Sequence, residues 1–371
     1  MVKSKVFSLF SSFMAGSLES ITSTMLEWSL VCCSLLGPYS GWIMSDEKTT
    51  SSLEDEYKLN KNPNLPDGVD RGRREEDNTL NPDDEDKDTL NLVFTIPVDH
   101  KGTSVYLKGW LQPDSKFPPV VLVHDLGENV RMYRGLAEAM GQKGFSVFGF
   151  DLRGHGRSGR MLGYVPHFES LVEDLLQVVA WIRFKSNGQL PMIIGQGVGG
   201  LITMYFKKKY PKYVRETILV APVVSEGKTM APMYRTFIRS MAEVTPRMRL
   251  PRAIVPQFLS LGGTEPSLRQ QKFQGITLHF AKEVINAIGG VHEVIKSFTG
   301  PAMIIAPQQV DGYDLKALKQ LLDELSFKDD LSLVEVGNIG TQPLTKEKEF
   351  TVVLDSIYSW LEEELGTPIE R

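Results

Sequence analysis

Continuous apolar runs that alternate with helix-like segments constrain the fold of this 371-residue chain more than any other feature. Pro119–His124, Phe145–Asp151 and Pro301–Ala306 are short runs of mostly aliphatic and aromatic residues. Segments with helical spacing of apolar residues, such as Phe168–Ile182, separate them. Strands that are apolar throughout and connected through helices form mostly parallel sheets with helices on both faces. The sequence therefore predicts an α/β domain over residues 89–371.

The remaining elements follow from the same patterns. Leu90–Val98 and Ser104–Leu111 are predicted to pair as a β-hairpin. Further strands are expected at residues 190–194, 216–221 and 331–336, and helices at 129–143, 167–186, 198–210, 314–326 and 347–365. Residues 225–298 interrupt the alternation with a mostly helical pattern, which predicts a helical cap inserted into the domain.

The N-terminal segment, residues 1–44, is apolar and carries only four charged residues. Its large apolar residues follow the spacing of one helix face: Phe10, Met14, Leu18, Ile21, Met25 and Trp28. We predict an amphipathic, membrane-associating segment whose Lys3 and Lys5 face anionic headgroups. The alternatives are a signal peptide and a helix that packs on its own domain or on a partner chain.

Residues 45–88 form an acidic linker with 15 Asp or Glu against 7 Lys or Arg. Such a composition cannot bury enough apolar surface to fold, so we predict a disordered tether.

The whole chain has a net charge of −5, the linker has 7 − 15 = −8, and residues 1–44 are neutral, which leaves +3 for residues 89–371. The acidic whole-chain charge argues against nucleic-acid binding. Only two cysteines are present, which excludes a disulfide framework and a cysteine-rich zinc site.

Four motifs resemble the α/β-hydrolases of the monoacylglycerol lipase and lysophospholipase group, also described as the serine aminopeptidase type. Residues 120–128 (VVLVHDLGE) are similar to the family's strand ending in His-Gly-x-Gly-Glu, and residues 150–158 (FDLRGHGRS) match its Phe-Asp-x-Arg-Gly-His-Gly-Arg-Ser loop. Residues 195–200 (GQGVGG) stand where the family has Gly-His-Ser-Met-Gly-Gly, and residues 220–222 (VAP) match the end of the next strand. The resemblance covers residues 90 to 366 and implies the α/β-hydrolase fold.

The residues that the family uses for catalysis are replaced in this sequence. The family's mechanism requires a serine nucleophile on a tight strand-to-helix turn, followed along the chain by an acid and a histidine base. Gly197 stands at the nucleophile position and Gly340 at the base position. Val310 occupies the acid position, with Asp311 one place later, and the last histidine of the chain is His292. We predict that no intact triad forms.

Other parts of the family's site are expected to persist. The resemblance implies that the backbone N–H groups of Leu126 and Val198 correspond to the oxyanion hole, the pair of donors that stabilises the negative oxygen of the intermediate. Asp125 replaces a family glycine; its carboxylate either points into the pocket, where it would oppose that oxygen, or faces solvent or caps the following helix. His124 is a candidate pocket residue, and the alternative for it is a packing role within its loop. Met230, Met233 and Met241 are candidates to line a lipid or partner groove in the cap, or simply to pack a cap helix.

These features predict a pseudo-hydrolase that binds a lipid or acyl ligand, or a protein partner, without a metal or cofactor. The alternatives are a divergent acyl hydrolase that uses groups outside the triad positions, and a structural scaffold subunit. We expect the protein to associate with membranes through residues 1–44, with a cytoplasmic location as the alternative.

Overall fold

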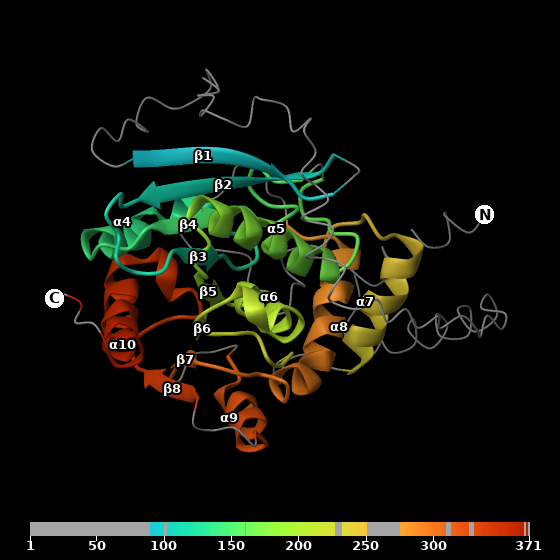
Figure 1. The fold of residues 1–371 in the computed structure, drawn as a ribbon. Helices are drawn as coiled ribbons and strands as arrows, with labels where there is room; N and C mark the ends of the chain where they lie inside the picture. Colours follow the sequence, from blue (N-terminus) through green and yellow to red (C-terminus); the bar gives the residue numbers. More distant parts are fainter. Residues whose placement is uncertain are drawn as a thin grey trace, which may run out of the picture. The chain divides into compact units, whose positions relative to one another are not determined.

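The computed structural model describes residues 90–99, 102–159, 161–226, 232–250, 275–308, 313–325, 330–366 and 369. The predicted anchor (1–44) and linker (45–88) lie outside the described residues. Within the described part, eight strands form one sheet (Figure 1): β1 (Leu90–Pro97), β2 (Ser104–Leu111), β3 (Val120–Val123), β4 (Val147–Phe150), β5 (Met192–Gln196), β6 (Thr217–Val220), β7 (Ala302–Pro307) and β8 (Leu331–Val336).

The strand order is β1-β2-β4-β3-β5-β6-β7-β8. β1 pairs with β2, and β2 with β4, in antiparallel fashion, whereas all pairs from β4 to β8 are parallel. The central strands are buried along their whole length because helices cover both of their faces. The predicted mostly parallel sheet is confirmed. β3 lies between β4 and β5, so the loops that follow these three strands leave the same edge of the sheet.

Seven α-helices lie in the described part: α4 (Arg134–Gln142), α5 (Glu169–Lys185), α6 (Val198–Lys209), α7 (Pro232–Val244), α8 (Leu278–Ile295), α9 (Leu315–Asp323) and α10 (Glu347–Leu365). α4 and α10 pack on one face of the sheet in a cluster that includes Leu122, Ile194 and Ile218. α5 and α6 pack against each other on the opposite face (Figure 1). Three short 3-10 helices, η2 (Val130–Tyr133), η3 (Pro211–Tyr213) and η6 (Pro343–Thr345), complete the described elements.

One predicted helix, 129–143, is divided into η2 and α4. Two side chains hold the tighter first turn in place. Asn129 caps it by accepting a hydrogen bond from the N–H of Arg131 (3.1 Å), and the buried Asp151 carboxylate accepts the Val130 N–H (2.7 Å). The contact from Asp151 could not be read from local sequence because it comes from the end of β4.

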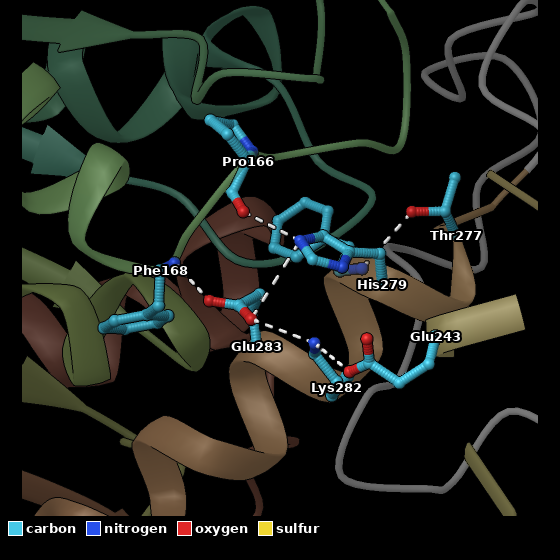
Figure 2. Close-up of polar contacts among 8 residues, drawn as sticks. Pro166, Phe168, Glu243, Thr277, His279, Lys282 and Glu283 are labelled. Atoms are coloured by element: carbon cyan, nitrogen blue, oxygen red, sulfur yellow. Dashed lines mark hydrogen bonds and ion pairs between the residues drawn. The ribbon is translucent and has the colours of Figure 1, made fainter. Parts of the chain in front are cut away.

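The insertion between β6 and β7 contains α7 and α8, which lie side by side (Figure 1). Figure 2 shows how the N-terminal turns of α8 contact the loop before α5. The His279 ring donates to the carbonyl of Pro166 (2.7 Å), and Glu283 accepts the N–H of Phe168 (3.0 Å). Lys282 connects α8 to α7 through an ion pair with Glu243 (2.8 Å). Polar contacts therefore join α8 both to the body of the domain and to α7.

No helix among the described residues is long and apolar enough to cross a membrane.

Candidate functional site

The turn between β5 and α6 has the geometry of a nucleophile elbow. Gly197 lies at its centre with φ 57° and ψ −120°, in the left-handed region that favours glycine. α6 then approaches β3 so closely that a Cβ on Gly199 would lie 2.2 Å from the carbonyl oxygen of Val123. The tight backbone turn is thus present, and it carries a residue without a side chain at its tip.

Asp125 follows β3 and directs its carboxylate at this turn. Its Oδ1 atom accepts the N–H of Leu126 and the N–H of Val198, each at 2.8 Å. Its Oδ2 atom accepts the side-chain amide of Gln342 at 3.2 Å. Of the two orientations expected for Asp125, the inward one is observed. One carboxylate oxygen is bound by both N–H groups that were predicted from the resemblance to be oxyanion-hole donors.

The Asp125 carboxylate also takes the space beside the elbow. A Cβ atom built on Gly197 would lie 2.2 Å from the carboxyl carbon of Asp125 and 2.4 Å from each of its oxygens. Real Cβ atoms do not approach other atoms this closely. Any side chain at position 197 would therefore require Asp125 to move.

Glu128 lies behind Asp125 in a buried polar cluster. Its carboxylate accepts the backbone N–H of Asp125 (2.9 Å), the hydroxyl of Tyr133, and the side-chain amide of Gln196 (3.0 and 3.1 Å). The Gln196 amide oxygen in turn accepts the N–H of Leu344 (2.8 Å). The cluster joins the β3 loop, the elbow and the loop after β8.

Burial raises the pKa of both carboxyl groups. For Asp125, hydrogen bonds from Val198, Leu126 and Gln342 oppose this rise because they stabilise the carboxylate form. For Glu128, the negative charge of Asp125 raises the pKa further. The two buried carboxyl groups therefore cannot both be ionised at low cost, and both have pKa values above their ordinary ones.

The loop after β8 contributes Gln342 to the site. At the predicted base position, Gly340 donates its N–H to Glu349 (2.7 Å), and a Cβ there would meet Glu349 Oε2 at 3.3 Å and Lys346 Nζ at 3.5 Å. Gln342, two residues later, is 7% exposed and reaches Asp125. A neutral amide from this loop therefore contacts the elbow.

The predicted acid positions, Val310 and Asp311, lie outside the described residues. The nearest described carboxylate after β7 belongs to Asp314, which caps α9 by accepting the N–H of Ala317 (3.0 Å). Asp314 also accepts the hydroxyl of Ser225 at 3.4 Å.

His124 is buried and hydrogen-bonded at both ring nitrogens. The Leu152 N–H donates to its Nε2 (2.9 Å), so its Nδ1 carries the proton and donates to the Asp125 carbonyl (2.7 Å). Burial lowers the pKa of His124 to about 4. His124 is therefore a neutral bridge between the β3 and β4 loops.

The three candidate methionines of the cap are described unequally. Met230 lies outside the described residues, as does the side chain of Met233. Met241 lies on α7 and is 3% exposed. The described residues contain no group of three His, Cys, Asp or Glu side chains that could hold a metal ion.

Glu128, Gln196 and Gln342 are the site residues that sequence reasoning missed. Glu128 and Gln196 lie inside the motifs quoted above, and position alone could have identified them. Nothing in the sequence connects Gln342 with Asp125, because 217 residues separate them.

Comparison with known families gives a match to most of the domain that carries this site. The family model described as serine aminopeptidase, S33, matches residues 116–329, which is more than half of the chain. A monoacylglycerol lipase of Mycolicibacterium smegmatis is 22% identical over 267 residues, which cover 70% of this chain and 93% of that protein. A monoglyceride lipase of Mus musculus is 23% identical over 270 residues, covering 71% and 88%.

Solved structures share the fold at lower identity. The crystal structure of Paleococcus ferrophilus monoacylglycerol lipase has a TM-score of 0.58 and 20% identity, covering 69% of this chain and 98% of that one. A soluble variant of Saccharomyces cerevisiae monoglyceride lipase in complex with a substrate analog has a TM-score of 0.58 and 18% identity, covering 73% and 96%. Both show the α/β-hydrolase fold.

Proposed function

This chain belongs to the serine aminopeptidase, S33, family of α/β-hydrolases, and we propose that it is a member that binds an acyl or lipid-like ligand without hydrolysing it. One observation carries the proposal: the chain's own Asp125 carboxylate accepts both N–H groups, of Leu126 and Val198, that this family's reaction would need.

Acyl transfer by this family requires a nucleophile, a base and stabilisation of a negative oxygen. Gly197 provides no hydroxyl, and the Gly340 position provides no imidazole. Asp125 opposes the third requirement, since a negative charge stands where the negative oxygen would form. Loss of a single oxyanion-hole donor lowers kcat on the order of 10² to 10³ in serine proteases. Here both donors are engaged.

The proposed ligand class rests on the relatives and on the fold. The relatives described above are named as lipases of monoacylglycerols or monoglycerides. Ligands of parallel α/β folds bind at the carboxyl ends of the strands. In this chain the elbow marks that edge, and α7 and α8 belong to the insertion that begins there. An acyl chain under this insertion would retain the family's ligand site without its reaction.

A divergent hydrolase and a structural scaffold remain the rival functions. Turnover by an unidentified nucleophile would support the first, and the absence of any acyl ligand would support the second. Association with membranes through residues 1–44, by way of the acidic tether 45–88, is a separate part of the proposal. If lipids fail to bind, a protein partner is the next ligand to test.

A thermal-shift series tests the binding proposal. We expect a long-chain monoacylglycerol or fatty acid to raise the Tm of the full-length protein, with larger shifts as the acyl chain lengthens. Met241→Gln should abolish the shift. Val244→Gln, a control on the same helix at a 55% exposed position, should keep it. No shift at any chain length would contradict the acyl-binding proposal and favour the scaffold.

A further inference from the structure

An exposed aromatic side chain lies at the end of the sheet opposite the elbow. Phe184, in the last turn of α5, is 70% exposed, the largest value among the exposed large apolar residues of the described part. α5 starts after β4 and ends before β5, so its last turn lies at the N-terminal ends of the parallel strands. The elbow, in contrast, lies at the C-terminal end of β5.

One basic residue lies beside this ring, and two others lie at the same end of α5. Lys185 places its Nζ atom 5.8 Å from the ring centres of both Phe184 and Trp181. Arg183 lies over the ring of Tyr213 at 5.8 Å, which brings η3 and its exposed Lys212 beside the end of α5. We call Arg183, Phe184, Lys185 and Lys212 the Phe184 surface.

The charge of the Phe184 surface is largely uncompensated. Within the described residues, Lys185 and Lys212 have no acidic side chain within ion-pair distance, and Arg183 donates to the carbonyl of Gly188. The neighbouring Arg215 is the exception, since it pairs with Glu216 at 2.6 Å. Three cations at the end of α5, one of them beside the exposed ring, therefore define a positive, partly apolar surface in a protein whose net charge is −5.

We propose that the Phe184 surface docks on a lipid surface with anionic headgroups. The side chain at the end of a helix protrudes, so it fits a deformable headgroup layer better than a rigid partner, which would need a matching pocket. Aromatic rings at the membrane interface, beside Lys and Arg that contact headgroups, are the usual features of peripheral binding. Each cation close to an anionic membrane surface strengthens binding about fivefold.

This contact is made by residues of the described domain, whereas the predicted anchor is the sequence segment 1–44. Stable membrane attachment generally needs two signals, and a folded surface could provide the second. Docking through the Phe184 surface would also turn the elbow end of the sheet away from the lipid. Docking of this kind does not require the elbow to be inactive.

Sedimentation with vesicles tests the proposal on the full-length protein. Vesicles of phosphatidylcholine alone are compared with vesicles of equal parts phosphatidylcholine and phosphatidylserine. We expect Phe184→Gln and Lys185→Glu each to reduce binding to the anionic vesicles several-fold. Val352→Gln, at a 44% exposed position on α10, and Arg239→Glu, at an exposed position on α7, are matched controls that should bind like wild type.

A second measurement separates this surface from any binding by residues 1–44. The tryptophan added in Phe184→Trp should give extra fluorescence over wild type, and brominated phosphatidylserine vesicles should quench this extra signal. The tryptophan added in Val352→Trp should give extra fluorescence that the same vesicles do not quench. Unquenched fluorescence at position 184 on bound protein would overturn the proposal. A lipid-independent dimer that Phe184→Gln dissociates would also overturn it, because the occupant would then be a second copy of the chain.

Discussion

At the scale of single residues, Asp125 and Gly197 depend on each other. The Asp125 carboxylate can accept both N–H groups at the elbow only if residue 197 has no Cβ atom. A Cβ at that position would lie 2.2 Å from the carboxyl carbon of Asp125. Conversely, a glycine at this tip adopts the left-handed φ of 57° without strain. The two substitutions relative to the family pattern therefore form one structural unit.

This dependence predicts a strong coupling between the two positions. Gly197→Ser should lower the free energy of unfolding by about 1–3 kcal/mol, because the new side chain collides with the carboxylate. In an Asp125→Gly background the same substitution should cost clearly less. Urea unfolding of the double-mutant cycle measures the coupling. Gly337→Ser, where a Cβ meets one atom at 3.7 Å, is the control. Equal losses in both backgrounds would show that Asp125 does not fill this space.

The Asp125–Glu128 pair predicts a pH dependence of stability. Burial raises the pKa of Glu128 above the unfolded value of about 4.3. The native state then binds more protons than the unfolded state, so stability falls as pH rises from that value through neutrality. Burial lowers the pKa of His124. This residue therefore contributes the opposite pH dependence, in which stability rises with pH between the lowered pKa and the ordinary one.

Comparison with a variant isolates the contribution of Glu128 to this pH dependence. Glu128→Gln should flatten the fall in the free energy of unfolding between mildly acidic and mildly alkaline pH, measured by urea titrations at several pH values. The control is Glu138→Gln, which removes a partly exposed ion pair with Arg134. A Glu128→Gln profile parallel to that of wild type would contradict the raised pKa of Glu128.

At the scale of elements, the loop after β4 is held by a buried ion pair. Arg153 donates to both oxygens of Asp174 (2.6 and 2.8 Å) and to Asp99 (2.9 Å), and the Asp174 side chain is fully buried. Arg153→Met leaves a buried charge without its partner, which should cost about 3–5 kcal/mol in unfolding free energy. Arg134→Met, which removes a partly exposed pair with Glu138, should cost less than about 1 kcal/mol. Similar losses for the two variants would refute the structural role of the Arg153 pair.

Helices and strands were predictable from sequence where the local spacing of apolar residues decides the structure. The parallel strands are continuous apolar runs, and α5 and α10 carry apolar residues at helical spacing, so their bounds were predicted within a few residues. The division of residues 129–143 into η2 and α4 was not predictable, because Asp151 contributes from the end of β4.

The site was predictable only in part, for the same physical reason. Family resemblance located Gly197, Leu126 and Val198, but the orientation of Asp125 remained open between pocket and solvent. Its contacts with Val198 and Gln342 span 73 and 217 residues of sequence. Only the folded arrangement of β3, the elbow and the β8 loop brings these groups together.

At the scale of the whole molecule, the proposals place two functions at opposite ends of one sheet. The elbow and the inserted helices would bind an acyl ligand at the C-terminal ends of the strands. The Phe184 surface would contact anionic lipid at their N-terminal ends. Residues 1–88, predicted as an anchor and an acidic tether, would add a second attachment to the membrane.

Labelling of the full-length wild-type protein with a fluorophosphonate shows whether this α/β-hydrolase turns over acyl esters through a serine. Loss of the nucleophile alone lowers kcat on the order of a million-fold in well-studied serine hydrolases. We predict no covalent adduct by intact-mass spectrometry and p-nitrophenyl ester turnover at the level of a blank. A stoichiometric adduct on any serine, with ester turnover that disappears on labelling, would show that the protein is a serine hydrolase. Ser225→Ala would then show whether the serine beside Asp314 is responsible.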